Sequence, residues 1–380
     1  MDTATANPSR QAAQSERALP TRDPGSLKFA ASDGFQAELR RRVDHYFEST
    51  GQRPRDCPRM YLKTAIVVVW FAAAYTLLVF FAQTWGQALP LVASFALSVA
   101  AVTFNIQHDG SHQAYSNRRW VNRLAAVTMD LVGASSYLWH WKHDVFHHTY
   151  TNVSGHDTDI EVGILGRLAP QQPRRRGHAW QHLYMWLAYA LMTSRWHLWG
   201  DFEEAIAGRI RGHRVPRPRG WDLAVFIGGK VFSLTLILVI PMLLHPVWLV
   251  ILFYLLATGI MGIVQAVVFQ LAHCVEEADF PVPQGDTLRM EHAWARHQVE
   301  TSVDFARGSR LLGWLLGGLN FQIEHHLFPR VCHVHYPALS VIVEETCQEF
   351  GVRYAANSTF WAGVGSHFRW LRRMGASGTA

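Results

Sequence analysis

Four apolar segments constrain the fold of this chain more than any other feature. Residues 64–82 and 88–106 contain no charged side chain, and further apolar segments cover about 223–244 and 247–270. At about 1.5 Å rise per residue, each segment comes close to the roughly 30 Å needed to cross the hydrocarbon core of a bilayer. The sequence therefore predicts four transmembrane helices.

Short connections pair these segments into two hairpins. Residues 83–87 join the first pair, and only His245 and Pro246 separate the second pair. The apolar stretches 183–193 and 311–319 are too short to span a bilayer, so we expect helices that lie in its interface. The expected fold class is an all-α integral membrane protein with four transmembrane helices in two hairpins and a cytosolic or interfacial helical cap.

The basic residues predict the orientation of the hairpins. The first 63 residues carry eleven Lys and Arg, and the segment 107–222 adds others, including Arg174, Arg175 and Arg176. The short turns inside the hairpins have none, so the positive-inside rule places both termini and the long connecting segment in the cytoplasm. The basic residues that give the net charge of +6 are explained mainly by this topology and by contact with lipid headgroups. The apolar segments argue against a nucleic-acid partner.

The chain divides into four parts by composition. Residues 1–25 are predicted to be a disordered arm, 26–60 a cytosolic or interfacial segment, 61–340 the membrane domain and 341–380 a cytosolic tail. The first 30 residues lack the apolar centre of a signal peptide. The four cysteines form no CxxC pair, and we expect free thiols in a reducing cytosol.

Histidines cluster just past the ends of the spans. They occur in the sequences HDGSH, HDVFHH, LAHC and QIEHH. Imidazole is the commonest metal ligand among side chains and binds in its neutral form. Residues four apart on a helix share one face, so these clusters can direct several imidazoles to one point. The candidate ligands are His108, His112, His143, His147, His148, His273, His325 and His326.

The number of imidazoles narrows the choice of metal. Zinc closes with about four ligands and haem takes two axial ligands, so eight histidines fit two irons better, with an open position for dioxygen. Most other histidines, such as His45, His178, His213 and His367, are expected at the surface or the interface. A metal transporter is a remote alternative. A transporter should place metal ligands or acidic side chains at mid-membrane. The spans offer only Gln265 and Lys230, and Lys230 is expected to extend to the near interface.

The three main histidine clusters resemble the histidine boxes of membrane fatty acid desaturases. HDGSH, HDVFHH followed by TYTN, and QIEHH followed by LFPR occur in the family's order of hairpin, two boxes, hairpin and third box. The resemblance runs from about Tyr61 to about Pro337 and implies that the eight histidines hold a di-iron centre. Most desaturases begin the third box with histidine. Gln322 stands there instead, which resembles the acyl-lipid and front-end subgroup. The resemblance leaves three roles open for Gln322: a weak ligand, a ligand through a water molecule, or a donor that supports the metal-bound imidazoles.

The resemblance also implies which polar residues support the imidazoles. Metal-bound histidines donate their second nitrogen to carboxylates or carbonyls. Acidic residues lie inside the boxes, and the segment TNVSGHDTD after the second box resembles the family's Asn-to-Asp stretch. The candidate supports are Asn152, Asp157, Asp159, Asp109, Asp144 and Glu324.

The resemblance implies an O2-dependent desaturase that introduces a cis double bond into an acyl chain. Hydroxylases, acetylenases and ketolases of the same class would use the same boxes, and only the product distinguishes them. The acyl chain would be carried on a lipid, coenzyme A or a carrier protein and would reach the metals through an apolar tunnel. Six tryptophans could line that tunnel or lie at the headgroup level, and we expect most of them to anchor the protein at the membrane interface: Trp139, Trp141, Trp180, Trp186, Trp196 and Trp199. Because no HPGG motif of a fused cytochrome b5 is present, a separate ferredoxin- or cytochrome b5-type donor with an NAD(P)H-linked reductase is implied.

Overall fold

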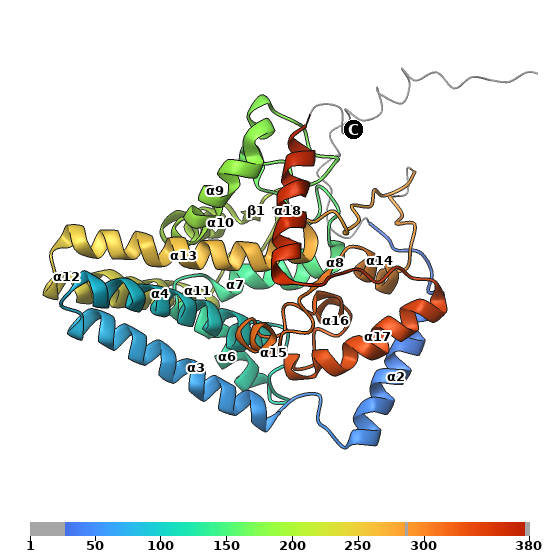
Figure 1. Ribbon diagram of the computed structural model, residues 1–380, viewed down its shortest axis with the longest axis horizontal. Coiled ribbons are helices and arrows are strands. Elements are labelled where there is room, and N and C mark those ends of the chain that lie inside the picture. The colour runs from blue at the N-terminus through green and yellow to red at the C-terminus, as the bar shows by residue number, and fades with distance from the viewer. Residues whose placement is uncertain (1–26, 286–287, 377–380) are drawn as a thin grey trace, which may run out of the picture.

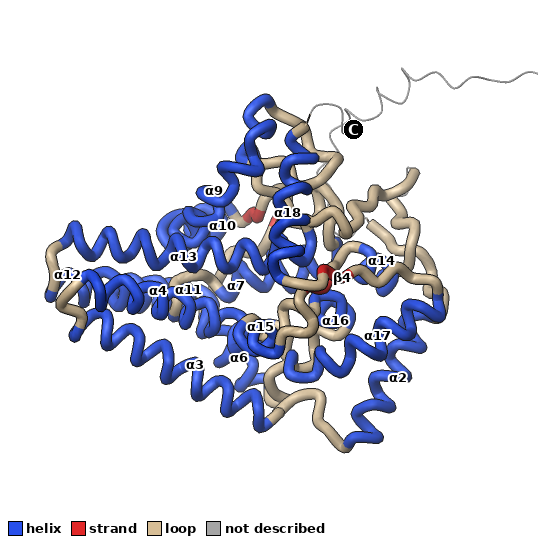
Figure 2. The backbone as a smooth tube through the Cα atoms, viewed as in Figure 1, coloured by secondary structure: helices blue, strands red, loops and turns tan. Residues whose placement is uncertain are grey.

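The computed structural model describes residues 27–285 and 288–376. The predicted disordered arm, residues 1–25, lies outside the described residues. Helices dominate the described chain, and strands occur only as two short pairs (Figures 1 and 2). Strand β1 (Arg209–Ile210) pairs antiparallel with β2 (His213–Arg214), and β3 (Asp304–Phe305) pairs parallel with β4 (Ala356–Asn357).

Four helices are long and apolar enough to cross a membrane, as the sequence predicts. They cover Pro58–Phe81, Trp85–Ser111, Trp221–Leu244 and Val247–His273. Three of them contain a π-helical turn. The first span consists of α3 (Pro58–Thr76) and η2 (Leu77–Phe81), and the second of α4 (Trp85–Val102), η3 (Thr103–Gln107) and α5 (His108–Ser111). The third span consists of α11 (Trp221–Leu234), η8 (Thr235–Val239) and α12 (Ile240–Leu244). The fourth span is the single helix α13 (Val247–His273).

The second and fourth spans form the centre of the bundle. In the most apolar window of the second span 67% of residues are buried inside the protein, against 17% in the first span, so the first span faces lipid. Phe95 and Val99 of α4 belong to one apolar cluster with Ala257 and Met261 of α13. Figure 1 shows α3, α4 and α13 running together toward one end of the molecule. Both central spans extend beyond their apolar stretches and end in histidines.

The remaining helices form a cap at the histidine end of the spans. After the first hairpin come α6 (Arg119–Leu131), α7 (Ser136–Trp139), η4 (His140–His147), α8 (His148–Tyr150), η5 (Gly163–Leu165), η6 (Arg176–Trp180), α9 (Gln181–Arg195), η7 (Trp196–Gly200) and α10 (Asp201–Ala207). After the second hairpin come α14 (Trp294–Glu300), α15 (Arg310–Leu315), α16 (Gln322–Leu327), η9 (His333–His335), α17 (Tyr336–Phe350) and α18 (Phe360–Gly375), and α2 (Phe35–Thr50) precedes the first span. Helices α9 and α15 correspond to the two short apolar stretches.

The structure places Lys230 differently from the expectation. Its side chain is buried, and its Nζ lies 2.9 Å from a carboxylate oxygen of Asp201 and 2.6 Å from the carbonyl oxygen of Gly133. The prediction that Lys230 extends to the membrane interface is therefore wrong. An internal carboxylate and backbone carbonyls satisfy the ammonium group, and they tie the third span to the cap.

The segment beyond residue 340 is part of the packed body as far as it is described. Helix α18 lies across the fourth span, where a Cβ at Gly363 would come within 3.0 Å of Leu271. The same helix shares an apolar cluster with α9 through Trp370 and Met185. A boundary at residue 340 therefore does not mark the end of the compact structure.

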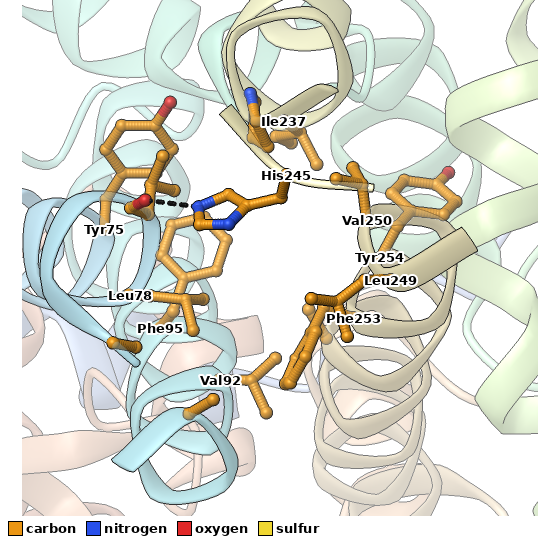
Figure 3. Close-up of a pocket in the computed structure, with 15 residues that line it drawn as sticks. Tyr75, Leu78, Val92, Phe95, Ile237, His245, Leu249, Val250, Phe253 and Tyr254 are labelled. Atoms are coloured by element: carbon orange, nitrogen blue, oxygen red, sulfur yellow. Dashed lines mark hydrogen bonds between the residues drawn. The ribbon is translucent and has the colours of Figure 1, made fainter. Parts of the chain in front are cut away.

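A small apolar cavity lies between the two hairpins (Figure 3). It has a volume of about 100 Å³, and Tyr75, Phe95 and Phe253 are among its lining residues. His245, from the turn of the second hairpin, reaches across with its Nε2 2.6 Å from the carbonyl oxygen of Val79. None of the eight clustered histidines lines this cavity, so it is separate from the candidate metal centre.

Candidate metal centre

The eight candidate histidines converge beneath the ends of the central spans. His108 and His112 come from the end of the second span, and His273 ends the fourth span. The second box contributes three rings from η4 and α8, and α16 contributes two from the third box. All eight are buried, with His112 the most exposed at 8%. The second span continues as a helix through the first box as far as Ser111, and this continuation gives the placement of His108 and His112.

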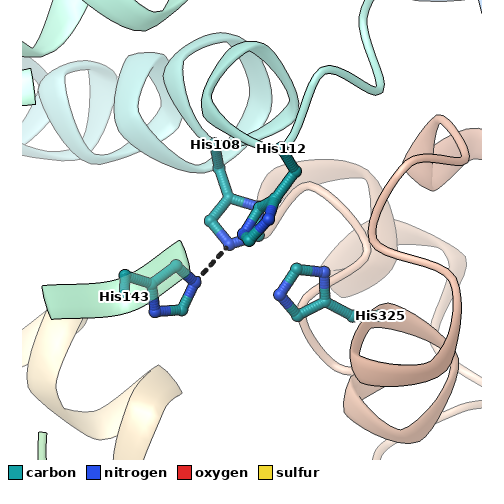
Figure 4. A group of neighbouring side chains, drawn as sticks. All are labelled: His108, His112, His143 and His325. Carbon is teal, nitrogen blue, oxygen red and sulfur yellow. Dashed lines mark hydrogen bonds between the residues drawn. The ribbon is translucent and has the colours of Figure 1, made fainter. Parts of the chain in front are cut away.

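Four of the rings form a first group (Figure 4). His108, His112, His143 and His325 each offer a ligand atom, and these atoms all lie within 4.8 Å of one another. The Nε2 atoms of His108 and His143 are 3.1 Å apart. Figure 4 shows the four rings, from three separate parts of the chain, pointing toward a common centre.

Three rings form a second group beside the first. His147, His273 and His326 also place their ligand atoms within 4.8 Å of one another. His148 lies between the groups, with its Nε2 3.3 Å from Nε2 of His143 and its ring stacked on His326 at 4.3 Å. The arrangement therefore offers two neighbouring metal positions rather than one.

The two nitrogens of these rings have different surroundings. The Nδ1 of His147 lies 3.0 Å from a carboxylate oxygen of Asp157, and the Nδ1 of His326 lies 2.8 Å from the amide oxygen of Gln298. The Nδ1 of His273 is 3.2 Å from the carbonyl oxygen of Thr301. In all three rings the Nε2 is buried without a hydrogen-bond partner among the described residues.

This pattern fits metal ligation. Buried polar atoms almost always have a hydrogen-bond partner. A metal-bound histidine typically has one ring nitrogen held by a hydrogen bond, here Nδ1, and leaves the other, here Nε2, to the metal. His325 repeats the pattern, with its Nδ1 3.3 Å from the hydroxyl of Tyr336 and its Nε2 unpartnered. A site of imidazoles without a cysteine thiolate suits iron or another metal that prefers nitrogen.

Electrostatics keep most of these rings neutral. The pKa values of His143, His148, His325 and His326 lie well below the usual range, first because the rings are buried and then because neighbouring imidazoles disfavour a positive charge. His147 differs: burial opposes its charge, but the carboxylates of Asp157 and Asp159 raise its pKa above the usual value. A neutral imidazole has a free lone pair for a metal.

Asn152 and Asp157 connect the second group to its surroundings. The backbone N–H of Asn152 donates to Asp157 at 2.8 Å, and its side-chain amide donates to the carbonyl oxygens of His273 and Thr301. Asn152 adopts a positive φ of 58°, a conformation that Asn tolerates better than most residues. The two residues thus link the second box to the end of the fourth span. Asp159 lies beside them, and burial followed by the charge of Asp157 raises its pKa to about 7.

Asp144 and Gln322 lie close to candidate ligands. A carboxylate oxygen of Asp144 is 3.5 Å from Nε2 of His112. Gln322 is buried at the start of α16, three residues before His325.

Asp109 and Glu324 bind residues outside the eight. Asp109 accepts from His333, whose Nδ1 is 2.9 Å away, and Glu324 accepts from the hydroxyl of Tyr354 at 3.0 Å.

Sequence reasoning missed several residues that hold the rings. Gln298, Thr301 and Tyr336 contact Nδ1 atoms, yet they lie outside the boxes and follow no spacing rule that would indicate the role. The expectation for other histidines is also wrong in part. His178, His213 and His367 are buried, because each finds a partner inside the fold, as His367 does with the carbonyl oxygen of Cys274 at 2.7 Å.

An apolar cavity of about 540 Å³ adjoins the first group. His108 and Asp159 line it near the imidazoles, and Trp139, Phe269 and Met192 are among its apolar walls. Its predominantly apolar lining suits a hydrocarbon chain. The cavity can therefore hold an alkyl chain beside the clustered histidines.

Four helices that could span a membrane and a buried cluster of histidines define a multi-pass membrane protein whose histidines are compatible with a metal site. Comparison with known proteins gives the family: the fatty acid desaturase profile matches residues 83–358. The chain is 40% identical to an sn-1 linoleoyl-lipid 6-desaturase of Arthrospira platensis, with 93% of this chain and 96% of that protein covered. A second enzyme of that name from Synechocystis is 37% identical over 92% of this chain and 98% of its own length.

The similarity extends to eukaryotic enzymes. An acyl-lipid (8-3)-desaturase of Physcomitrium patens is 37% identical over 91% of this chain and 72% of that protein. The chain belongs to the fatty acid desaturase family. It is a membrane oxidoreductase that desaturates fatty acyl chains, and the prediction from the histidine boxes is confirmed.

Proposed function

We propose that the eight histidines hold two iron ions and that the enzyme inserts a cis double bond at position 6 of an acyl chain carried on a membrane lipid. The observation that carries the metal assignment is the set of rings fixed at Nδ1 and unpartnered at Nε2. The position and the lipid carrier rest on the two relatives named as sn-1 linoleoyl-lipid 6-desaturases.

Bound iron would supply the oxidising power to remove two vicinal hydrogens with O2. The residues of the chain supply position and shielding. Trp139 and Phe269 form walls of the cavity beside His143, with ring centroids 4.7 Å and 5.3 Å from that imidazole. An alkyl chain held between such walls presents only a few methylenes to the metals, and this restriction makes the attack regioselective.

Charged side chains in the lining of the cavity suit the ester end of the substrate. Lys142 and Arg211 line the cavity, and Lys142 pairs with Glu204 at 2.6 Å. A double bond at position 6 requires the ester carbonyl group to lie only a few carbons from the metals. Charged side chains of the cavity close to the histidines would therefore suit the ester group.

The electron donor and the orientation are also parts of the proposal. A separate ferredoxin- or cytochrome b5-type protein, recharged by an NAD(P)H-linked reductase, supplies electrons from the cytoplasm. The basic residues of the long connecting segment favour a cytoplasmic location of the centre and of both termini. Arg118, Arg119 and Arg123 follow directly after the first box and belong to this basic set.

The product identifies the reaction. The chain is expressed in a bacterial host supplied with linoleate, and acyl chains are analysed by gas chromatography–mass spectrometry beside a His147→Ala/His148→Ala variant. A new trienoic chain with a double bond at position 6 that is absent from the variant is expected. A hydroxylated or acetylenic product would contradict desaturation, and a bond at another position would contradict the regiochemistry. Iron measured in purified protein should approach two per chain and fall sharply in the variant.

A further inference from the structure

A second, polar recess lies next to the first histidine group. Its volume is about 670 Å³, and it is bounded by α5, α6, α7 and the start of α11. Arg119, Arg123 and Arg330 line it together with His140 and Asp144. None of the eight candidate ligands and none of the aromatic walls of the acyl cavity lines it, so it has no place in holding the acyl chain.

Helix α6 indicates that the recess faces water. Arg119, Asn122 and Arg123 turn toward the recess, and their spacing of three and four residues puts them on one face. Trp120 and Leu124, on another face of the helix, are 63% and 64% exposed. A helix with one apolar and one basic face lies in the membrane interface with its apolar face in lipid. The basic face and the recess are then on the aqueous side.

The rim of the recess is rich in positive charge. Arg119 and Arg330 form no ion pair with any residue between 27 and 376 that the structure describes. Arg55 lies beside Arg330 and donates from its Nε to the carbonyl oxygen of that residue at 3.0 Å. Two acids line the recess. Asp222 pairs with Arg123 at 3.1 Å, and Asp144 lies beneath the surface.

A short path leads from this recess to the metal centre. The side chain of His140 is 56% exposed, and its Nδ1 lies 2.9 Å from one carboxylate oxygen of Asp144. The other carboxylate oxygen of Asp144 lies 3.5 Å from Nε2 of His112. Ser111 fixes the carboxylate by donating at 2.6 Å. Two side chains therefore connect solvent with the first histidine group.

We propose that the recess is the docking surface for a small acidic one-electron carrier protein and that His140 and Asp144 couple that carrier to His112. This proposal rests on the proposed function, which requires a separate donor. Each carrier is oxidised by one electron. Two electrons from two carriers, two protons from water and the two hydrogens taken from the acyl chain together reduce one O2 to two water molecules.

Charge favours an acidic protein over a free phosphate or a lipid headgroup. A small anion that entered the recess would approach the carboxylate of Asp144, whereas an acidic protein surface can meet the arginines at the rim without entering. Complementary charge of this kind speeds encounter and sets orientation, and its effect weakens with salt because screening at physiological ionic strength acts within about 8 Å.

Binding tests the docking surface independently of activity. The full-length, iron-loaded enzyme in phosphatidylcholine nanodiscs is titrated with an acidic [2Fe–2S] ferredoxin and with the haem domain of cytochrome b5. An Arg119→Gln/Arg330→Gln variant should bind the carrier about 10-fold more weakly at low salt and lose most of the salt dependence. The matched control, Arg310→Gln/Arg372→Gln, removes the same charge from exposed positions that do not line the recess and should bind like the wild type.

The path from the recess is tested by a second variant. At saturating carrier, His140→Ala should oxidise reduced carrier several-fold more slowly than the wild type, and a wild-type rate would overturn the path through His140 and Asp144. Unchanged carrier affinity in the arginine variant overturns the docking surface. The docking surface is also overturned if the arginine variant loses binding to phosphatidylglycerol vesicles while its carrier binding stays intact. That result would assign the recess to lipid headgroups. Absence of product from the wild type with dithionite would count against the proposed function, while the binding data would still decide the docking surface.

Discussion

At the scale of single residues, the candidate metal centre depends on what holds the outer nitrogen of each ring. Asp157 is the strongest case, because its buried carboxylate contacts Nδ1 of His147 with both oxygens, at 3.0 and 3.1 Å. It also accepts the backbone N–H groups of Asn152 and Asp159. One side chain thus orients an imidazole and closes the loop that follows the second box.

We expect Asp157→Asn to lower iron affinity about 10- to 100-fold, the usual effect of losing a carboxylate that supports a metal-bound histidine. Asn keeps an acceptor for the backbone N–H groups but loses the charge that increases the basicity of His147. Iron retained after dialysis against graded chelator measures the effect. Asp279→Asn, at an exposed carboxylate paired with Arg353, is the control and should retain iron like the wild type. Equal retention in both variants would contradict this role of Asp157.

Asp130 should make stability depend on pH. Burial raises the pKa of Asp130 to about 6, whereas the pKa of Asp in an unfolded chain is about 3.9. This difference in pKa corresponds to roughly 3 kcal/mol of stability. The folded protein therefore binds a proton that the unfolded chain has already lost, and this contribution disappears as pH rises from about 4 to about 6. Asp130→Asn should raise the Tm at pH 7 and flatten its decline between about pH 4 and about pH 6. A wild-type slope in the variant, measured beside exposed Asp222→Asn, would refute this assignment.

At the scale of elements, the cap is joined to the spans by close contacts and buried charges. A Cβ at Gly110 would lie 2.6 Å from the backbone nitrogen of Ala126, so α5 approaches α6 at a distance that only glycine permits. Lys230 of α11 and Asp201 of α10 form the corresponding connection on the other hairpin, with both side chains 4% exposed. These contacts fix where the ends of the spans lie, and hence where the histidines meet.

Breaking the buried pair should destabilise the protein more than removing it. Lys230→Met leaves the carboxylate of Asp201 buried without its cation, which costs about 3–5 kcal/mol in comparable cases. The Lys230→Met/Asp201→Asn double variant removes both charges and should recover much of that loss. Thermal unfolding in one detergent, followed for wild type, both single variants and the double variant, gives the coupling between the two residues. Additive losses would show that the ion pair does not stabilise the fold.

Sequence reasoning reached the spans and the boxes because these depend on local pattern. The predicted spans agree with the helices to within three residues at most of their ends. The first helix begins at Pro58, six residues before the apolar run, and the second ends at Ser111, five residues after it. The residues that hold the rings were out of reach, because contacts such as Gln298 with His326 and Tyr336 with His325 depend on how distant loops fold together. Lys230 was misplaced for the same reason: no local pattern reveals a partner carboxylate 29 residues away.

At the scale of the whole molecule, the metal centre joins parts of the chain that are far apart in sequence. The first box ends the second span, His273 ends the fourth, and the third box begins 49 residues after His273, at Gln322. Without a metal, several inner nitrogens are buried with no partner, and each such group costs about 1–3 kcal/mol. The centre is therefore expected to hold the two hairpins and the cap together as well as to perform chemistry.

Metal removal should accordingly loosen the whole molecule. Binding that occurs only in the folded state adds to its stability, so chelation of reduced enzyme should lower the Tm by several degrees and speed proteolysis of the loop at residues 279–285. Refilling with iron should restore both stability and desaturation. Zinc, which has no redox chemistry, should restore stability without activity. The His147→Ala/His148→Ala variant should start with the lower Tm and respond little to chelator. An unchanged Tm after complete iron removal would mean that packing alone holds the cap on the hairpins.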